Sequence, residues 1–292
     1  MEKIWTVLEI LDWSVDFLKN KGIEEAKYKV ELMLSKVLNF KRFDLYLNFD
    51  RPLSKLEREK FKSCLLRAAS NEPVQYILGE WEFYGYNFKV DNSVLIPRRE
   101  TEELVEKVYE YLIENLNGNF TVADIGTGSG AIIISLYLEL KKKLNNEDFN
   151  LIDFYAIDIS KAALKKAVEN ANLNNAENIV FLEGDMLKNF DKKIDLLISN
   201  PPYVSFKEYK NLPKELYFEP QSALTDNKDG LSFYRELIAE VKERNIKKAF
   251  FEIGYNQKDE LESMCIENQI SDFKFHKDLS GNFRILETDL RS

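Results

Sequence analysis

The chain has few of the residues on which several common catalytic strategies depend. Among 292 residues there is one histidine, His276, and there are two cysteines, Cys64 and Cys265. The histidine falls in a predicted strand near the end of the chain, which favours a structural role over membership of a catalytic triad. Both cysteines lie in apolar patterns of helical spacing, so we expect buried thiols and neither a disulfide nor a metal site.

Long apolar runs are missing as well. The first twenty residues interleave charged and apolar positions at helical spacing, unlike a signal peptide, and no later stretch approaches a membrane span. Hydrophobic residues still make up 45% of the chain, enough for a full core in each of two domains. We therefore expect a cytoplasmic protein without a membrane partner.

Glycine is scarce, with 11 residues, but three of them gather in one loop. Gly126-Thr127-Gly128-Ser129-Gly130 follows a predicted strand, Phe120–Ile125, and precedes an apolar helix that starts at Ala131. Glycines allow close backbone approach and positive φ, and a helix N-terminus offers free N–H groups. The spacing G-x-G-x-G differs from the dinucleotide fingerprint G-x-G-x-x-G, so the loop predicts a nucleotide-type cofactor site of another class.

Two further strand ends carry candidate cofactor contacts. The next predicted strand ends at Asp158, whose carboxylate could accept hydrogen bonds from both ribose hydroxyls of an adenosine. Ser160 is a better cap than Asp158 for the helix that follows. A third strand, 178–182, leads to Asp185, which could accept the adenine amino group, and to Met186, which could flank the ring. Both residues could equally be ordinary loop residues.

The tetrapeptide Asn200-Pro201-Pro202-Tyr203 is the most informative pattern in the chain. It follows a buried-strand pattern, 194–199, and lies 70 residues after Gly130. The side-chain oxygen of Asn200 and the carbonyl of Pro201 can each accept one N–H of a substrate NH2 group and direct its lone pair at an electrophilic methyl group. Pro202 removes a competing donor, and the Tyr203 ring can lie against the planar group. Taken alone, the tetrapeptide could be an ordinary turn.

Further motifs accompany these two in a definite order. They are Arg67 with 72–79, Phe83-Tyr84-Gly85, 95–102, Glu219-Pro220 with Ala223-Leu224, Asp229-Gly230-Leu231, Glu252-Ile253-Gly254 with Gln257, and Asp278 with Gly281 and Arg284. With this set the chain resembles, over nearly its whole length, the protein-(glutamine-N5) methyltransferases that modify peptide chain release factors. Two positions depart from the family pattern: Arg99 replaces a second proline, and Met186 stands where many members have a tryptophan.

The resemblance implies a function and a set of contacts. It implies methyl transfer from S-adenosylmethionine, with S-adenosylhomocysteine as product, to the glutamine side chain in the Gly-Gly-Gln loop of release factors, which supports translation termination. It implies cofactor contacts from Gly126 through Gly130, Asp158 and Asn200, and a substrate glutamine held by Asn200 through Tyr203. The expected partner is the release factor, with no stable nucleic acid, and a monomer suffices.

The order of predicted elements gives an α/β fold with a seven-stranded, Rossmann-like class I methyltransferase sheet. A helical substrate-docking domain (1–72) and a β-hairpin linker (73–95) precede the methyltransferase domain (96–292). Helical patterns run roughly over 2–20, 23–38, 43–47 and 54–69, the last opened by a capping box of Ser54 and Glu57. Predicted parallel strands near residues 120, 152, 178, 194 and 248 alternate with helices, and strands 273–277 and 282–287 close the sheet as an antiparallel hairpin.

Charge bears on the choice of acceptor. The net charge of −9 is concentrated after residue 72, and an acidic catalytic domain fits nucleic acid poorly. A small basic excess lies in the fourth helical segment and just before it, at Arg51, Lys55, Arg58, Lys60, Lys62 and Arg67. This basic face is typical of a solvated helix, and we also consider that it docks a protein partner.

Three alternative functions share part of this pattern. A nucleic-acid exocyclic-amine methyltransferase (adenine N6 or guanine N2) can use the same tetrapeptide, but no basic target-recognition domain follows the sheet. An NAD-dependent dehydrogenase is disfavoured by the glycine spacing and by the 28 residues from Gly130 to Asp158, against about 20 in the dinucleotide fingerprint. A cofactor-binding module without catalysis would be expected to have lost part of the tetrapeptide, which is complete.

Overall fold

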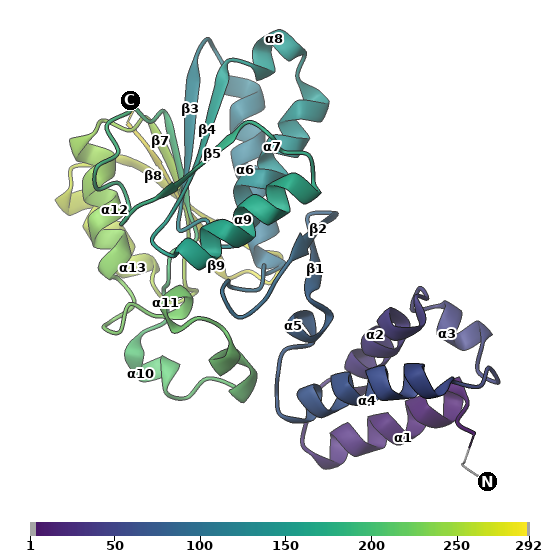
Figure 1. Cartoon of the computed structure of the whole chain (residues 1–292). Helices are drawn as coiled ribbons and strands as arrows, with labels where there is room; N and C mark the ends of the chain where they lie inside the picture. The colour runs from purple at the N-terminus through teal and green to yellow at the C-terminus, as the bar shows by residue number, and fades with distance from the viewer. Residues whose placement is uncertain (1–3, 291–292) are drawn as a thin grey trace. The chain divides into compact units, whose positions relative to one another are not determined.

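The computed structural model describes residues 4–290 and separates them into two compact units. The first unit runs to Glu80 and also includes Pro213–Phe218, and the second holds the remaining residues from Trp81 onward. Figure 1 shows a helical N-terminal part and a sheet covered by helices.

The first unit is built from helices whose ends are set by local capping. They are α1 (Val7–Asn20), α2 (Ala26–Leu38), α3 (Asp44–Leu47), α4 (Lys55–Ala69), α5 (Val74–Leu78) and the 3-10 helix η1 (Lys214–Phe218). The predicted capping box at α4 is confirmed: Ser54 caps the backbone of Glu57, whose side chain bonds back to Ser54. The first predicted helix was too long, because Thr6 and Glu9 form a second capping box that starts α1 at Val7; residues 2 and 3 of that prediction lie outside the described part.

A two-stranded hairpin, β1 (Glu80–Phe83) and β2 (Tyr86–Lys89), opens the second unit, except that the first residue of β1, Glu80, belongs to the first unit. Its main sheet has seven strands in the order β5-β4-β3-β6-β7-β9-β8. They are β3 (Phe120–Ile125), β4 (Ile152–Asp158), β5 (Ile179–Glu183), β6 (Leu196–Ser199), β7 (Lys248–Glu252), β8 (Asp272–Lys277) and β9 (Phe283–Asp289). The first five are parallel, and β9 pairs antiparallel with both β7 and β8. This antiparallel end confirms the predicted fold class.

Helices cover both faces of this sheet, as Figure 1 shows. One face packs against α6 (Glu100–Asn115), α7 (Ala131–Lys143) and α9 (Lys161–Leu173), and the other against α12 (Ser232–Glu243) and α13 (Lys258–Glu267). Shorter helices, α8 (Asn146–Phe149), α10 (Phe206–Tyr209) and α11 (Gln221–Leu224), lie in the connections. The alternation within β3 is clear, since Val122 faces one core and Ala123 the other.

The structure corrects the expectation that both cysteines are buried, and it shows the surroundings of the single histidine. Cys265 is buried in α13, but Cys64 is only half-buried on α4; both are free thiols. The single histidine, His276, lies on β8 with Nε2 2.6 Å from a carboxylate oxygen of Glu287 on β9. Among residues 4–290, no group of three or more His, Cys, Asp or Glu side chains is placed to hold a metal, and no helix is long and apolar enough to cross a membrane.

Candidate active site

The carboxyl ends of four neighbouring parallel strands bring the predicted site segments into one row. The register pairs Glu183 with Asp158, and pairs Ile125 with both Ile157 and Ser199. The segments that leave these strand ends are therefore, in spatial order, Gly184–Met186, Asp158, Gly126–Gly130 and Asn200–Tyr203. This is the edge at which open α/β sheets bind ligands.

The glycine loop has the backbone geometry that its composition predicts. Gly126, Gly128 and Gly130 all have positive φ, at 73°, 56° and 78°. At Gly130 an added Cβ would lie 2.7 Å from Cδ1 of Ile134 and 3.2 Å from Cβ of Ala167, so a larger residue would have to displace these side chains where α7 meets α9. At Gly126 such an atom would meet nothing within 4 Å, which leaves open space against that part of the loop.

Hydrogen bonds hold the loop at both ends. The backbone N–H groups of Gly126 and Thr127 donate to the carbonyl of Ile157 at 2.8 and 3.1 Å. The carbonyl of Ser129 accepts from Nδ2 of Asn170 at 2.9 Å, and Asn170 is fully buried on α9. Sequence reasoning missed Asn170, because nothing distinguishes an asparagine inside an amphipathic helix until the fold brings it to the loop.

Asp158 lies at the tip of β4 and joins two parts of the site. Its carboxylate accepts from the backbone N–H of Gly128 at 2.8 Å and from that of Ser160 at 2.8 Å. Burial raises the pKa of Asp158, and these backbone donors oppose the shift. Two oxygens offer about four acceptor positions, so capacity for further donors remains. Ser160 caps α9 through the N–H of Ala163, as predicted.

A second carboxylate, Asp124, stands behind the loop. It is fully buried, and Oδ2 accepts from the Thr127 hydroxyl at 2.7 Å, whereas Oδ1 has no hydrogen-bond partner among the described residues. Burial raises the pKa of Asp124 to about 7, and the nearby charge of Asp158 adds to the shift. Asp124 therefore stiffens the loop from inside the protein.

The tetrapeptide leaves β6 beside the glycine loop. The hydroxyl of Ser199, the last residue of β6, donates to the carbonyl of Ile125 at 2.7 Å and so ties the two strand ends together. Nδ2 of Asn200 donates to Oγ1 of Thr101, on α6, at 3.3 Å. The side-chain oxygen of Asn200 is therefore the end of the amide that points away from Thr101.

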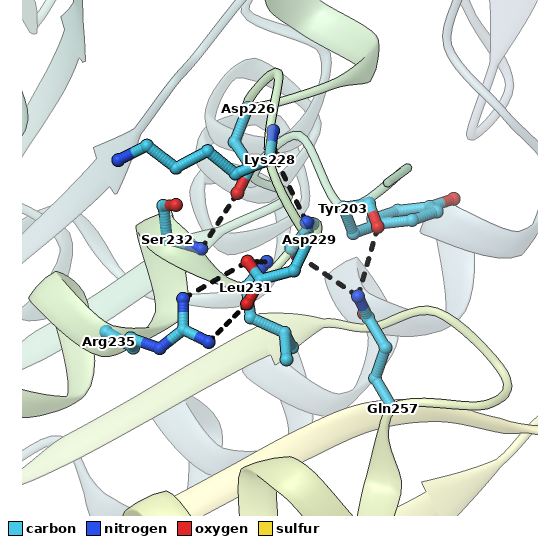
Figure 2. A network of polar contacts seen from close by, with 9 residues as sticks. Tyr203, Asp226, Lys228, Asp229, Leu231, Ser232, Arg235 and Gln257 are labelled. Carbon is cyan, nitrogen blue, oxygen red and sulfur yellow. Dashed lines mark hydrogen bonds and ion pairs between the residues drawn. The ribbon is translucent and has the colours of Figure 1, made fainter. Parts of the chain in front are cut away.

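Tyr203 is fixed at both its ring and its backbone. Its hydroxyl donates to Oε1 of Glu252 at 3.4 Å, and burial, together with the charge of Glu252, raises the pKa of Tyr203. Its carbonyl accepts from Nε2 of Gln257 at 3.0 Å, a contact visible in Figure 2. Gln257 also donates to the carbonyl of Gly230 at 3.1 Å and accepts from the N–H of Gly254 at 2.9 Å. One amide thus connects three segments that are distant in sequence.

Two aspartates, Asp226 and Asp229, order the loop 226–232, which is drawn next to Tyr203 in Figure 2. Asp226 accepts from the backbone N–H groups of Lys228, Gly230 and Ser232 at 2.8 to 3.0 Å. Asp229 pairs with Arg235, which lowers the pKa of Asp229 to about 2.

This loop also approaches the tetrapeptide closely. At Gly230, where φ is 81°, a Cβ would lie 2.3 Å from the carbonyl oxygen of Tyr203. Glycine is therefore required for the loop to lie against the tetrapeptide.

Asp185 and Met186, the predicted adenine contacts, lie at the far end of the row. Asp185 is ion-paired with Lys188, with 2.5 Å between Oδ2 and Nζ. Met186 adopts a φ of 52° and packs partly against the core beneath α12 and α13. Both predicted adenine contacts stay predictions.

Three polar side chains around the tetrapeptide had no role assigned from sequence: Thr101, Glu252 and Gln257. All three fall in motifs of the resemblance, which gave their positions but not their contacts. Glu252 ends β7, fully buried, and burial raises the pKa of its carboxyl to about 7 despite hydrogen bonds from Thr101 and Tyr203 and the charge of Arg284. A buried acidic residue at the end of a strand that adjoins β6 is the signal that could have identified it.

The fold and these strand-end loops define a class I methyltransferase. Residues 116–275 match the family described as "Methyltransferase domain". The same fold occurs in the catalytic domain of human METTL16, with a TM-score of 0.58 and 15% identity over 81% of this chain and 82% of that one.

Comparison with curated proteins narrows the class to one family. Residues 9–79 match the family "PrmC N-terminal domain". The release factor glutamine methyltransferase of Fusobacterium nucleatum is 39% identical over 96% of this chain and 77% of its own length, and that of Bacillus subtilis is 36% identical over 96% of both. The chain belongs to the release factor glutamine methyltransferase family.

Proposed function

We propose that this chain transfers the methyl group of S-adenosylmethionine to the side-chain nitrogen of the glutamine in the Gly-Gly-Gln loop of peptide chain release factors. It would act in the cytoplasm as a monomer and support translation termination. The observation that carries the proposal is the strand register, since Ile125 and Ser199 are direct partners and their two loops leave the sheet side by side. Family membership supplies the acceptor.

The cofactor proposal rests on the fit of the glycine loop. Open space lies against Gly126, and the Asp158 carboxylate stands beside Gly128 with acceptor capacity left for hydroxyl donors. We assign contacts to Gly126 through Gly130, to Asp158 for the ribose, to Asn200, and to Asp185 and Met186 for the adenine. When bound, S-adenosylmethionine supplies an electrophilic methyl group on a sulfonium.

The tetrapeptide performs the chemistry by holding the acceptor. An amide nitrogen is a poor nucleophile, because its lone pair is delocalised into the carbonyl group. The side-chain oxygen of Asn200 and the carbonyl of Pro201 accept the two N–H groups of the substrate amide and fix the direction of its nitrogen. Pro202 adds no competing donor, and the Tyr203 ring flanks the amide plane.

The same two oxygens also stabilise the positive charge that develops on the attacking nitrogen. No strong base is needed, because the cationic product nitrogen loses its proton to water afterwards. Positioning of this kind contributes roughly 7 to 11 kcal/mol in favourable systems.

We further propose that the N-terminal helical unit (1–72), followed by a linker (73–95) and the catalytic domain (96–292), binds the protein substrate. The structure reduces the charge available on the basic face, because Arg51, Lys55 and Arg67 are ion-paired with Glu57, Glu59 and Glu72. Reversing Lys60 and Lys62 tests two further charges of this face: we expect weaker binding of the release factor at low salt, and unchanged affinity would reject a role for this face.

The function itself is tested by incubating a purified release factor with the protein and S-adenosylmethionine, followed by intact mass and peptide mapping. One added methyl group on the glutamine of the Gly-Gly-Gln loop is expected. DNA and RNA are offered in parallel with a labelled methyl donor. Label in nucleic acid without label in the release factor would reject the proposed acceptor and favour an exocyclic amine.

A further inference from the structure

A chain of hydrogen bonds runs from a buried carboxylate to the Asn200 amide. The register pairs Ser199 of β6 with Phe251 of β7, which brings Glu252 next to Asn200. Oγ1 of Thr101 donates to Oε2 of Glu252 at 2.6 Å. The same Thr101 oxygen, Oγ1, accepts from Nδ2 of Asn200 at 3.3 Å. Thr101 is 4% exposed and Glu252 2%, so water does not compete for these contacts.

When Glu252 is ionised, the order of donors and acceptors in this series of hydrogen bonds has one direction. A hydroxyl group has a single hydrogen to donate. Because the Glu252 carboxylate takes the hydrogen of Thr101, only the lone pairs of that hydroxyl face Asn200, and they accept an N–H. The two ends of an asparagine amide have nearly the same shape, so its hydrogen bonds decide which end points where. Here they turn the nitrogen inward and leave the oxygen as the outward acceptor.

Glu252 also contacts the other end of the tetrapeptide. Its second oxygen, Oε1, accepts from the Tyr203 hydroxyl at 3.4 Å. Its backbone is held in turn, because the Tyr234 hydroxyl on α12 donates to the Glu252 carbonyl at 2.6 Å. One side chain therefore contacts Tyr203 directly and reaches Asn200 through Thr101.

We propose that Glu252 and Thr101 are positioning residues for methyl transfer, which fix the Asn200 amide so that its oxygen, and not its NH2 group, faces the acceptor nitrogen. This role rests on the proposed function, in which Asn200 must accept an N–H from the substrate. We call these hydrogen bonds from Glu252 through Thr101 to Asn200 the relay. Without the relay, the Asn200 amide is free to turn its NH2 group toward the substrate NH2 group, and two donors then face each other. The relay therefore acts on kcat more than on cofactor affinity.

The first test compares Thr101→Val with Thr101→Ser. Valine keeps the shape of the side chain and removes the hydroxyl, whereas serine keeps the hydroxyl. We expect Thr101→Val to lower kcat for release-factor methylation about tenfold, the scale of one lost hydrogen bond, and to leave the Kd of S-adenosylmethionine within about twofold. Thr101→Ser should keep kcat within about threefold of the parent.

Thr288→Val is the matched control. Thr288 on β9 is also buried, at 1% exposed, and its hydroxyl has no hydrogen-bond partner among the described residues. The same substitution there should leave kcat unchanged. Equal losses for the valine and serine variants at Thr101, or a loss in Thr288→Val as large as in Thr101→Val, would show that packing and not hydrogen-bond direction is being measured.

Glu252 is tested by a second pair, Glu252→Gln and Glu252→Leu. A glutamine carbonyl can accept from Thr101 while its NH2 group donates to the Tyr203 hydroxyl, so direction is kept; leucine keeps neither contact. We expect leucine to lower kcat at least as much as Thr101→Val does and glutamine to retain most of it. A leucine variant as active as the glutamine variant would overturn the proposal.

A double-mutant cycle locates the effect at Asn200. In an Asn200→Ala background, Thr101→Val should lower the residual single-turnover rate by less than about twofold, because no amide is left to orient. A further tenfold loss there would place the effect elsewhere and overturn the relay. The parent chain is measured in the same assay: a parent that methylates no release factor rejects the proposed function and this role with it, whereas an active parent with an equally active Thr101→Val variant rejects the relay alone.

Discussion

The two loops of the site are held in different ways. The glycine loop, Gly126–Gly130, owes its three positive φ angles and the start of α7 to its own residues, and Asp158 and Asn170 add hydrogen bonds at sequence separations of 30 and 41. The tetrapeptide, Asn200–Tyr203, is oriented mainly by side chains far away in the chain, at sequence separations of 99 for Thr101 and 54 for Gln257. The backbone shape of the glycine loop can therefore be predicted from one segment, whereas the orientation of the tetrapeptide side chains depends on the fold.

We expect the largest loss of kcat from a substitution in the tetrapeptide that leaves the glycine loop unchanged. Asn200→Ala removes the acceptor oxygen proposed to hold the substrate NH2 group, and by analogy with the loss of one preorganised catalytic hydrogen bond we expect kcat to fall roughly 10²- to 10³-fold. The fold and much of the affinity for S-adenosylmethionine should survive, because the glycine loop keeps its own contacts. Single-turnover methylation with calorimetric cofactor binding measures both, and near-normal turnover would reject the positioning mechanism.

The next largest effect is a loss of unfolding free energy from a substitution in the glycine loop. Gly130→Ala combines a strained positive φ with a Cβ only 2.7 Å from Ile134 Cδ1, and we expect it to destabilise the protein by roughly 2 to 4 kcal/mol.

Gly126→Ala is the matched control for that collision. It carries a similar φ of 73° in open space and should cost roughly 1 kcal/mol. Chemical denaturation of both variants isolates the collision, and equal losses would show that strain alone sets the requirement for glycine.

A smaller effect separates cofactor binding from catalysis. Asp158→Ala removes the carboxylate proposed to bind the ribose, and charge-assisted hydrogen bonds of roughly 1.5 to 3 kcal/mol correspond to a Kd for S-adenosylmethionine weakened about 10- to 100-fold. At saturating cofactor, kcat should change little. Asp153→Ala on the same strand, where the side chain is exposed, is the control. Parent-like affinity in Asp158→Ala would reject the ribose assignment.

These differences match what the sequence could and could not predict. The strand ends at Ile125, Asp158 and Ser199, the positive φ angles of the loop glycines and the caps at Ser54 and Ser160 depend on a few neighbouring residues, and their prediction is confirmed. The roles of Thr101 and Glu252 depend on which strands are neighbours and on the direction of single hydrogen bonds. Residue types alone do not contain that information, even where a family pattern marks the positions.

The helical ends show the same limit on a smaller scale. The apolar spacing of the first segment suggested a helix from residue 2, but the capping box of Thr6 and Glu9 sets the start at Val7. The periodicity predicts that both Cys64 and Cys265 are buried, yet only Cys265 is; Cys64 packs against the core of the first unit and stays half-buried.

The smallest effect sharpens the comparison through pH. Burial raises the pKa of Glu252 from 4.5 to about 7, so between these values the folded carboxyl keeps a proton that the unfolded chain has lost. Stability from this group is full below pH 4.5 and falls by about 1.4 kcal/mol per pH unit as pH rises toward 7. Asp124 behind the glycine loop changes the unfolding free energy with pH in the same direction, because its pKa is raised from 3.8 to about 7.

Glu252→Gln should therefore remove one of the two contributions that fall as pH rises. Between pH 6 and pH 7 the parent should lose about 1 kcal/mol more unfolding free energy than the variant, as measured by urea denaturation at each pH. Identical slopes in the two proteins would mean that the Glu252 carboxyl does not titrate in this range in the folded state, and that it stays ionised as the acceptor for Thr101 throughout.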